Sequence, residues 1–406
     1  MYFRISYLNK IVKALEKEKV VTLLGARQVW KTTILMQLKE KFFPNAKYIN
    51  CEKYFFGEKI STYKEFLNFL KFQLNIDLTT DWIVFFDEIQ VLSNFETFLK
   101  ILYDDSEIKA KIVVTGSILN VSWKVGSTMV GRWKVIKIFP FSFYEFLESK
   151  WLNIKTLESV KLDWIRDYLL EYLIFGGYPK VVFAKSKQEK IEEISNIIDS
   201  YLKKDILFFF SQDEIVWFKK IFQKIVLDLW SIFSYESLAT NLGISIYKVK
   251  KYLKFLENSF LIYPVYPFFT DKTKEYSKNP KIYLNDLWLI NWFRWNFSSI
   301  EFSDWKLIEN FVFLALNWLW FWEINFYRKK SGSEIDFIIR NLWWKIIPIE
   351  VKTRKYCKIP QVFKSFLEKY EKIIDKFIVT NLEDTKQIDF NGKKVFCVRW
   401  WDLKIW

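Results

Sequence analysis

The segment GARQVWKTT, residues 25–33, combines a glycine, a lysine and two hydroxyl side chains at a spacing suited to phosphate binding. It matches the phosphate-loop pattern G-x-x-x-x-G-K-[ST], except that Trp30 stands at the second glycine. In such a loop the main-chain N–H groups surround the phosphates, Lys31 reaches the β- and γ-phosphates, and the Thr32 hydroxyl ligates Mg²⁺. The segment predicts a Mg-ATP site formed by Gly25, Ala26, Arg27, Gln28, Val29, Trp30, Lys31, Thr32 and Thr33.

Further polar residues follow the loop at positions that complete such a site. The apolar run 83–86 leads into Asp87, expected to hold Mg²⁺ through water, and Glu88, expected to polarise the attacking water. Ser117 ends another apolar run and is placed to sense the γ-phosphate. Arg132 is a candidate charge-stabilising finger, and a surface salt bridge is the alternative for it.

A second set of acids lies near the C-terminal end. The segments EIDFII, residues 334–339, and IIPIEVK, residues 346–352, alternate polar and apolar residues, so we expect a hairpin. Folding it about residue 343 places Asp336 opposite Glu350, with Lys352 on the same face. These residues resemble the D…ExK centre of the PD-(D/E)xK nuclease superfamily. The resemblance implies that Asp336 and Glu350 bind Mg²⁺ and that Lys352 positions the nucleophile, with Glu309 as a further acid; a binding module without cleavage is the alternative.

The middle of the chain predicts a winged helix-turn-helix. Residues 235–262 suggest a helix, a turn at Gly243 and a second helix, and the apolar stretches 260–269 and 281–284 suggest a two-stranded wing. The second helix carries the lysines that DNA phosphates would contact: Lys248, Lys250, Lys251 and Lys254. A winged helix that docks on a protein is the competing interpretation.

The elements that position these groups indicate an α/β fold. Strand-like runs at 20–24, 47–50, 83–86 and 111–115 are separated by helical stretches, which is typical of a parallel sheet. We expect three domains: an ATPase domain over residues 1–150, a helical region over 151–285, and a mixed α/β nuclease-like domain over 286–406.

Composition excludes several classes of site. The 406 residues contain no histidine, so histidine-based nucleophilic sites and histidine-ligated metals are impossible. The three cysteines lie far apart without a CxxC pair, which favours a reducing, cytoplasmic compartment and argues against structural zinc. No apolar run is long enough for a membrane span. The net charge of +15 fits either a nucleic-acid partner or the lysine-rich output of an AT-rich genome.

Glycine is scarce and tryptophan abundant. The chain has 10 glycines and 20 tryptophans, whereas typical glycine usage of about 7% would give roughly 28 glycines. Trp30 replaces a phosphate-loop glycine, and Trp343 and Trp344 stand where a hairpin favours glycines. We hypothesise that many of these codons are UGA and are read as glycine by the source organism. The alternative is a genuinely tryptophan-rich protein, in which the loop is defective.

The order of motifs adds a resemblance. The succession GARQVWKTT, FFDEIQ, VVTGS, VGRW, FPFSFYEFL and YLIFGGYPKVV resembles a family of bacterial and archaeal AAA-superfamily ATPases that carry a C-terminal domain of unknown function. The departures are tryptophans at glycine positions: Trp30, Trp123, Trp230, Trp288 and Trp305.

The motifs and the resemblance together predict ATP and Mg²⁺ as cofactors and ATP hydrolysis coupled to DNA binding or processing, and a second copy of the chain is a further candidate partner. The alternatives are a regulatory ATPase whose distal domains dock protein partners, and an inert scaffold if Trp30 is genuine.

Overall fold

The computed structural model divides the chain into two compact units. Unit 1 comprises residues 1–139 and 258–260, and unit 2 comprises residues 140–257 and 261–406. The structure describes all residues except 1, 56, 58–59, 93, 117–133, 153–161, 202–209, 228, 230, 277, 299–303, 319–322, 330, 342 and 404–406. Among the described helices, none combines the length and apolar character needed to cross a lipid bilayer.

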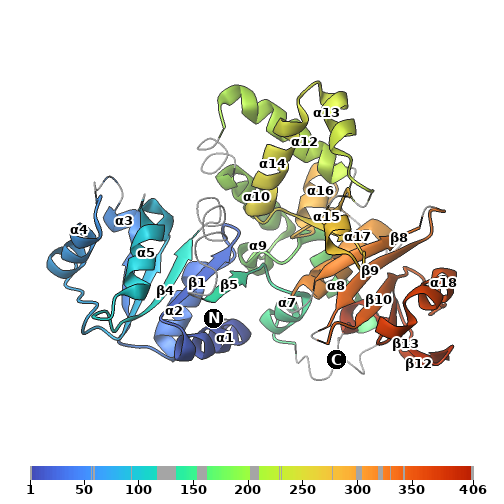
Figure 1. Cartoon of the computed structure of the whole chain (residues 1–406), viewed down its shortest axis with the longest axis horizontal. Helices are drawn as coiled ribbons and strands as arrows, with labels where there is room; N and C mark the ends of the chain where they lie inside the picture. Colours follow the sequence, from blue (N-terminus) through green and yellow to red (C-terminus); the bar gives the residue numbers. More distant parts are fainter. Residues whose placement is uncertain are drawn as a thin grey trace. The chain divides into compact units, whose positions relative to one another are not determined.

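Unit 1 is built on a sheet that includes β1, β4 and β5 (Figure 1). The sheet is parallel, and its strand order is β2-β3-β4-β1-β5. The strands are β1 (Val20–Gly25), β2 (Lys47–Asn50), β3 (Ile83–Asp87), β4 (Lys111–Gly116) and β5 (Lys134–Ile138). The sequences of β1 and β3 are nearly continuous apolar runs, and every residue of both strands is buried. This is expected for a sheet that is covered on both faces. The predicted α/β fold with an N-terminal parallel sheet is therefore confirmed.

One helix precedes these strands, and further helices lie between them along the chain. They are α1 (Ile5–Lys17), α2 (Lys31–Lys41), α3 (Cys51–Phe55), α4 (Tyr63–Asn68), the π-helix η1 (Phe69–Gln73), the 3₁₀-helix η2 (Ile89–Val91) and α5 (Phe95–Asp104). One apolar cluster joins α3, α4 and α5 to one face of the sheet, and it includes Phe55, Phe66, Phe86, Phe98 and Leu102. This packing fixes the carboxyl ends of β1 and β3, where the loop and the acids were predicted.

Unit 2 begins with a helical region and has further helices between the strands of its sheet. Its helices are α7 (Phe143–Ser149), α8 (Leu162–Phe175), α9 (Pro179–Phe183), α10 (Lys187–Ser200), α12 (Gln212–Leu227), α13 (Tyr235–Leu242), α14 (Ile246–Asn258), α15 (Lys272–Tyr276), α16 (Trp288–Arg294), α17 (Trp305–Trp318) and α18 (Gln361–Tyr370), with 3₁₀ turns η5 (Glu371–Ile373) and η6 (Trp400–Asp402). The prediction that residues from about 155 to 285 are mainly helical and end in a short β segment is confirmed for the described part.

A mixed sheet with the strand order β12-β13-β11-β10-β9-β8-β6-β7 completes unit 2. The strands are β6 (Ile262–Pro267), β7 (Lys281–Leu284), β8 (Ile324–Arg328), β9 (Glu334–Arg340), β10 (Ile346–Val351), β11 (Phe377–Asn381), β12 (Lys386–Phe390) and β13 (Lys393–Arg399). β6 and β7 are the two strands predicted as a wing, and β6 also pairs in parallel with β8 through Tyr266 and Asn325. The sheet thus crosses the expected boundary at residues 285 and 286, and the three-domain division stays a prediction.

The glycine pair that follows α8 is required by close packing. Gly176 has φ of 71°, and a Cβ atom there would lie 1.6 Å from an oxygen of Asp286. A Cβ atom on Gly177 would lie 2.1 Å from the carbonyl oxygen of Phe141. The Gly177 N–H donates to Asp286 at 2.9 Å, and burial raises the pKa of this carboxyl to about 7.

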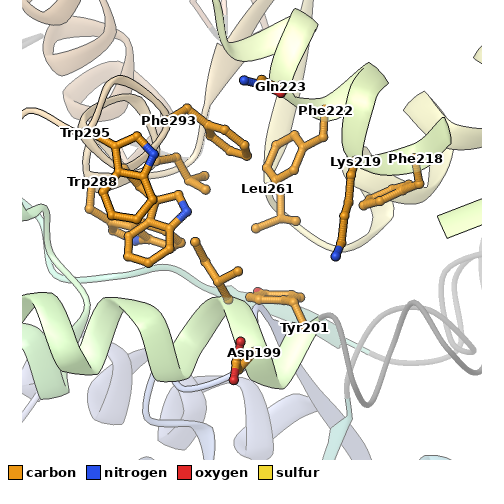
Figure 2. Close-up of a pocket in the computed structure, with 13 residues that line it drawn as sticks. Asp199, Tyr201, Phe218, Lys219, Phe222, Gln223, Leu261, Trp288, Phe293 and Trp295 are labelled. Carbon is orange, nitrogen blue, oxygen red and sulfur yellow. The ribbon is translucent and has the colours of Figure 1, made fainter. Parts of the chain in front are cut away.

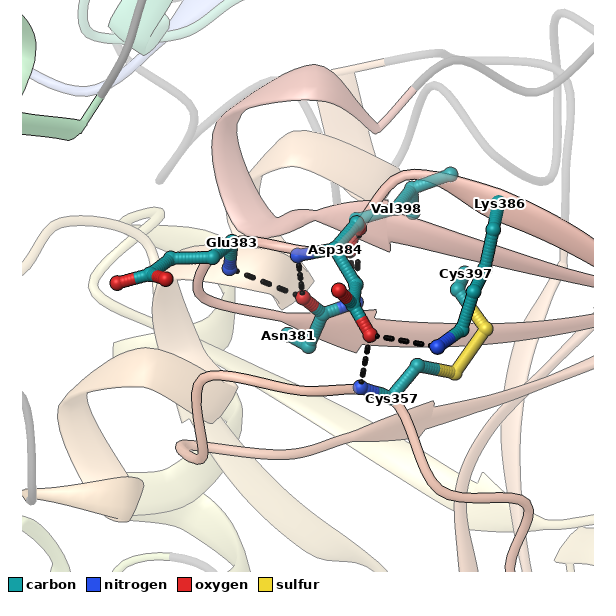
Figure 3. The surroundings of a disulfide bond; sticks show 7 residues. All are labelled: Cys357, Asn381, Glu383, Asp384, Lys386, Cys397 and Val398. Atoms are coloured by element: carbon teal, nitrogen blue, oxygen red, sulfur yellow. Dashed lines mark hydrogen bonds and ion pairs between the residues drawn. A yellow bond between two sulfur atoms is a disulfide. The ribbon is translucent and has the colours of Figure 1, made fainter.

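Two of the three cysteines form a disulfide within unit 2 (Figure 3). Cys357 and Cys397 are 40 residues apart in sequence, with Cα atoms 5.9 Å apart. The Asp384 carboxylate accepts a hydrogen bond from the Cys357 N–H at 2.8 Å and pairs with Lys386 at 2.9 Å. Nothing in the spacing of the cysteines predicts this pairing, because β13 and the loop after β10 meet only in the folded sheet.

Candidate functional site

The predicted phosphate loop lies between the end of β1 and the start of α2. A Cβ atom on Gly25 would lie 2.3 Å from the carbonyl oxygen of Ile138, so the strand pairing itself requires glycine at this position. The Lys31 ammonium lies over the loop and donates to the carbonyl oxygens of Gly25 at 3.0 Å and Ala26 at 2.9 Å. The strand, loop and helix therefore follow one another as the sequence pattern predicts.

The predicted Mg²⁺ ligands of the loop and of β3 come together. The Thr32 hydroxyl donates to the Asp87 carboxylate at 2.7 Å, and Asp87 is almost fully buried. A hydroxyl and a carboxylate oxygen at this distance are a suitable donor pair for Mg²⁺, which favours oxygen ligands and keeps several waters. The residues present therefore fit the Mg²⁺ that the loop pattern implies.

Sequence reasoning missed two hydroxyls that hold Asp87. Tyr48 on β2 donates to Asp87 at 2.9 Å, and Thr115 on β4 donates to its other oxygen at 2.5 Å. Burial and the negative charge of Asp87 raise the pKa of Tyr48. Both hydroxyls reach Asp87 because β2 and β4 flank β3 in the folded sheet.

Glu88, the expected water-polarising residue, directly follows β3. Its main chain is left-handed with φ of 56°, and its N–H donates to the Thr115 hydroxyl at 3.0 Å. Gln90 donates to the Glu88 carboxylate at 2.5 Å. Thr115 therefore links the orientations of Asp87 and Glu88. Ser117 and Arg132, as well as Trp123 and Trp230, lie outside the described residues.

Trp30 adopts a main-chain conformation that favours glycine. Its φ and ψ are 71° and 32°, and Trp151, Trp295 and Trp344 also have φ between 51° and 64°. These four account for nearly half of the non-glycine residues with positive φ in the described part of the chain, although such a conformation costs a bulky residue about 1–2 kcal/mol. The observation favours recoding at Trp30 and Trp344. It gives no support at Trp288, which is fully buried against Tyr178.

The C-terminal hairpin has the predicted register. β9 and β10 are antiparallel with Ile349 opposite Phe337, so the next pair along is Glu350 and Asp336. The Val351 N–H donates to Asp336 at 2.7 Å, and the Lys352 ammonium donates to Glu350 at 2.5 Å. The structure therefore brings together the three residues that sequence reasoning selected.

Burial dominates the electrostatics of this hairpin. It raises the pKa of Glu350 to about 8, with the charge of Asp336 adding to the effect, and it also raises the pKa of Asp336. The second carboxylate oxygen of Glu350 is buried and has no hydrogen-bond partner. An unpartnered buried carboxylate oxygen is costly, so this arrangement suits a cation.

Glu309 takes part in a different set of contacts from the one expected. On α17 it accepts from the Tyr283 hydroxyl at 2.5 Å and pairs with the buried Lys281 at 3.4 Å. Lys281 also pairs with Glu334 on β9. In the described residues no group of three acidic or cysteine side chains is arranged to hold a metal ion. Asp336 and Glu350 thus offer two carboxylates, which fits a Mg²⁺ that keeps several waters.

Sequence reasoning missed Lys281, because it belongs to the predicted wing rather than to the hairpin motif. Burial alone would lower the pKa of Lys281, but the charges of Glu309 and Glu334 outweigh it and the pKa is raised. Burial raises the pKa of Glu309 to about 7, and Asp336 adds to this effect. The lysine is therefore charged and paired.

In the segment predicted as a winged helix-turn-helix, the structure has α13, a turn at Gly243 with φ of 65°, and α14, and the winged helix stays a prediction. Two of the four lysines selected for DNA contact are already paired. Lys251 contacts Glu214 at 2.8 Å, and Lys254 contacts Glu257 at 3.0 Å. Lys248 and Lys250 are exposed, so α14 offers fewer uncommitted charges than the sequence suggests.

A pocket of about 390 Å³ lies between α10, α12 and α16 in unit 2 (Figure 2). Its walls are mainly aromatic and include Tyr201, Phe218, Phe222, Phe293 and the tryptophans at 288, 292 and 295. Its shape therefore depends on whether residues 288, 292 and 295 are tryptophan or glycine.

Family models match three successive parts of the chain. A model described as an AAA domain matches residues 17–147, which contain the phosphate loop and Asp87–Glu88. Models described as domains of unknown function, DUF8612 and DUF4143, match residues 166–299 and 306–401.

Two curated relatives extend over most of the chain. An uncharacterized protein of Methanocaldococcus jannaschii is 30% identical over 338 residues, covering 79% of this chain and 72% of the relative. An uncharacterized protein of Haemophilus influenzae is 26% identical over 299 residues, covering 70% of this chain and 69% of the relative. Among solved structures, a Walker-type ATPase of Pyrococcus abyssi superposes with a TM-score of 0.48 at 17% identity, covering 72% of this chain and 96% of that chain.

Proposed function

From the premise that this chain belongs to the same family as the Methanocaldococcus jannaschii relative and carries an AAA domain at residues 17–147, we propose that it hydrolyses Mg-ATP at residues 25–33 and couples hydrolysis to the binding or processing of DNA. The AAA part of the resemblance noted from the motifs is confirmed by the match over residues 17–147. The observation that carries the proposal is the 2.7 Å contact between Thr32 and Asp87 beside the loop.

The chain's own residues supply the binding and the proton chemistry. The main-chain N–H groups of the loop and the Lys31 ammonium bind the phosphates, and Thr32 and Asp87 hold Mg²⁺. When bound, Mg²⁺ neutralises charge that develops on the β- and γ-phosphates. Glu88 accepts a hydrogen bond from the attacking water, and Thr115 keeps Glu88 beside Asp87.

The test uses the Trp30→Gly protein as the parent, because an indole at position 30 would occupy space that the nucleotide needs. Lys31→Ala should abolish Mg-ATP binding, and Glu88→Gln should retain binding and lose turnover. Binding is measured by calorimetry and turnover by phosphate release. Equal turnover in Glu88→Gln and its parent would remove Glu88 from the proposed role.

We also propose that the hairpin of β9 and β10 is a Mg²⁺-dependent phosphodiester-cleaving centre. Asp336 and Glu350 are the metal ligands, and Lys352 stabilises charge next to the attacking water. The supporting observation is the buried, unpartnered oxygen of Glu350 beside a lysine.

Linear and circular DNA, with Mg²⁺ and then Mn²⁺, test this centre with and without ATP. Asp336→Ala and Glu350→Ala should each eliminate cleavage, whereas Lys352→Ala should slow cleavage and leave metal binding nearly intact. ATP turnover should persist in all three. A Trp30→Gly parent that cuts neither substrate in any condition would contradict the nuclease proposal and leave the ATPase proposal standing.

A regulatory ATPase with protein-docking distal domains is the second candidate function. The pairing of Lys251 with Glu214 and of Lys254 with Glu257 favours it, because these lysines then have less charge available for phosphates. DNA affinity that does not change with salt concentration would support this candidate over the first.

A further inference from the structure

Lys281 lies at the edge of the carboxylate hairpin and outside the motif that predicted it. It is the first residue of β7, and only 3% of its side chain is exposed. Its ammonium contacts Glu309 on α17 at 3.4 Å and also Glu334 on β9. A buried ammonium held between two carboxylates is a fixed positive charge at a defined position.

The four acids around this hairpin divide into two pairs. Glu334 and Asp336 are two residues apart on β9 and share one face of the strand. Glu309 and Glu334 contact Lys281. Asp336 and Glu350 are instead held by the Val351 N–H and by Lys352. Only Glu350 keeps a buried oxygen without a partner in this set.

The cations are divided unequally between the two pairs. Glu309 and Glu334 have Lys281, and Glu334 also has Arg328 at 3.7 Å. Asp336 and Glu350 have Lys352 as their nearest cation, so this pair keeps a net negative charge when both carboxylates are ionised. A single bound cation is therefore favoured at Asp336 and Glu350, whereas without Lys281 the buried Glu309 would lose its cationic partner.

We propose that Lys281 is a built-in cation that takes the place of a second metal ion, so that this centre binds one divalent metal at Asp336 and Glu350. The inference rests on the proposed metal centre and specifies it. In this arrangement Glu309 contacts Lys281 and Tyr283 and is not a metal ligand. This agrees with the lack of a three-carboxylate group among the described residues. Lys281 is then a positioning residue that holds Glu309 and Glu334 in place.

The experiment counts metal ions. Mn²⁺ is titrated into nucleotide-free protein, and electron paramagnetic resonance distinguishes free from bound Mn²⁺. The starting protein and every variant carry Asp87→Asn, which weakens the phosphate-loop site. The starting protein should bind one Mn²⁺ per chain. Lys281→Met should bind two, and Lys281→Arg should bind one because it retains the charge.

Lys190→Met is the matched control, since Lys190 is also buried and pairs with Glu171 at 3.1 Å far from the hairpin motif in sequence. It should lose stability without changing the number of bound Mn²⁺ ions. A Lys281→Met protein that still binds one Mn²⁺ with unchanged affinity would overturn the inference.

Two further variants cover the case in which Lys281→Met does not fold. Glu309→Gln and Glu334→Gln should each keep one Mn²⁺ with an affinity within about threefold of the starting protein, whereas replacing a group that ligates the metal or orients one of its ligands would cost about 10-fold or more. A loss of that size in Glu309→Gln would make Glu309 part of the metal site and overturn the inference. If the starting protein binds no Mn²⁺, the proposed metal centre fails as well. If it binds one and the lysine has no effect, only the role of Lys281 fails.

Discussion

Replacing Trp30 by glycine should turn a strained loop into a functional one. Trp30 has φ of 71°, a conformation that costs an L-residue about 1–2 kcal/mol and costs glycine almost nothing. Glycine also makes the unfolded chain more flexible, which lowers the free energy of unfolding by about 0.5–1 kcal/mol. The net gain is therefore about 0.5–1 kcal/mol at this position.

The same reasoning applies to Trp151, Trp295 and Trp344, whose side chains are 87%, 75% and 75% exposed and lose little burial when removed. The fourfold variant should be more stable than the parent by about 2–4 kcal/mol, measured by urea denaturation. Trp82→Gly is the matched control, because Trp82 is 83% exposed and is not among the residues with positive φ. It should give no such gain.

Binding provides the second readout for position 30. The Trp30→Gly protein should bind Mg-ATP in calorimetry, and the Trp30 protein should not. In the gene, codons 30, 230, 288, 305, 343 and 344 should be UGA. UGG at codon 30, together with no gain in stability or in ATP binding on Trp30→Gly, would refute the reasoning.

Three more outcomes are expected. Lys248→Ala with Lys250→Ala should flatten the log–log salt dependence of DNA affinity by about 1.8 in a filter-binding assay, whereas replacing the paired Lys251 and Lys254 should change it less. Reducing the Cys357–Cys397 bond, which closes a 40-residue loop, should lower unfolding free energy by about 3–4 kcal/mol, and Cys357→Ser should remove the response to reductant. Because burial raises the pKa of Asp286 to about 7 from 3.8, the folded state binds its proton more tightly and stability should fall as pH rises from about 4 to about 7. Asp286→Asn should reduce that slope in denaturation at a series of pH values.

Local pattern was sufficient to predict the parts of the site that follow one strand directly. The runs at 20–24 and 83–86 are buried strands, and the residues after them, Lys31 to Thr32 and Asp87 to Glu88, meet because parallel strands end at one edge. The hairpin register could also be predicted, since a two-residue period and one turn position fix which residues oppose each other.

Contacts between distant segments could not be predicted in this way. Tyr48 and Lys281 belong to no recognisable motif, and each contacts a carboxylate on another element. The pairing of β6 with β8 depends on strands from two expected domains, and strand β5 was missed because its KVIKI segment is only partly buried. The Cys357–Cys397 bond likewise depends on a sheet order that spacing along the chain does not contain.

The pairing of β6 with β8 bears on how this protein can be divided. A fragment that begins at residue 286 would lack β6 and β7, so the hydrogen-bonding edge of β8 would become exposed, and exposed edges favour aggregation. The same cut would remove Lys281 and Tyr283 and leave Glu309 buried without its partners. A C-terminal fragment is therefore expected to keep its sheet and the partners of Glu309 only if it begins at or before Ile262.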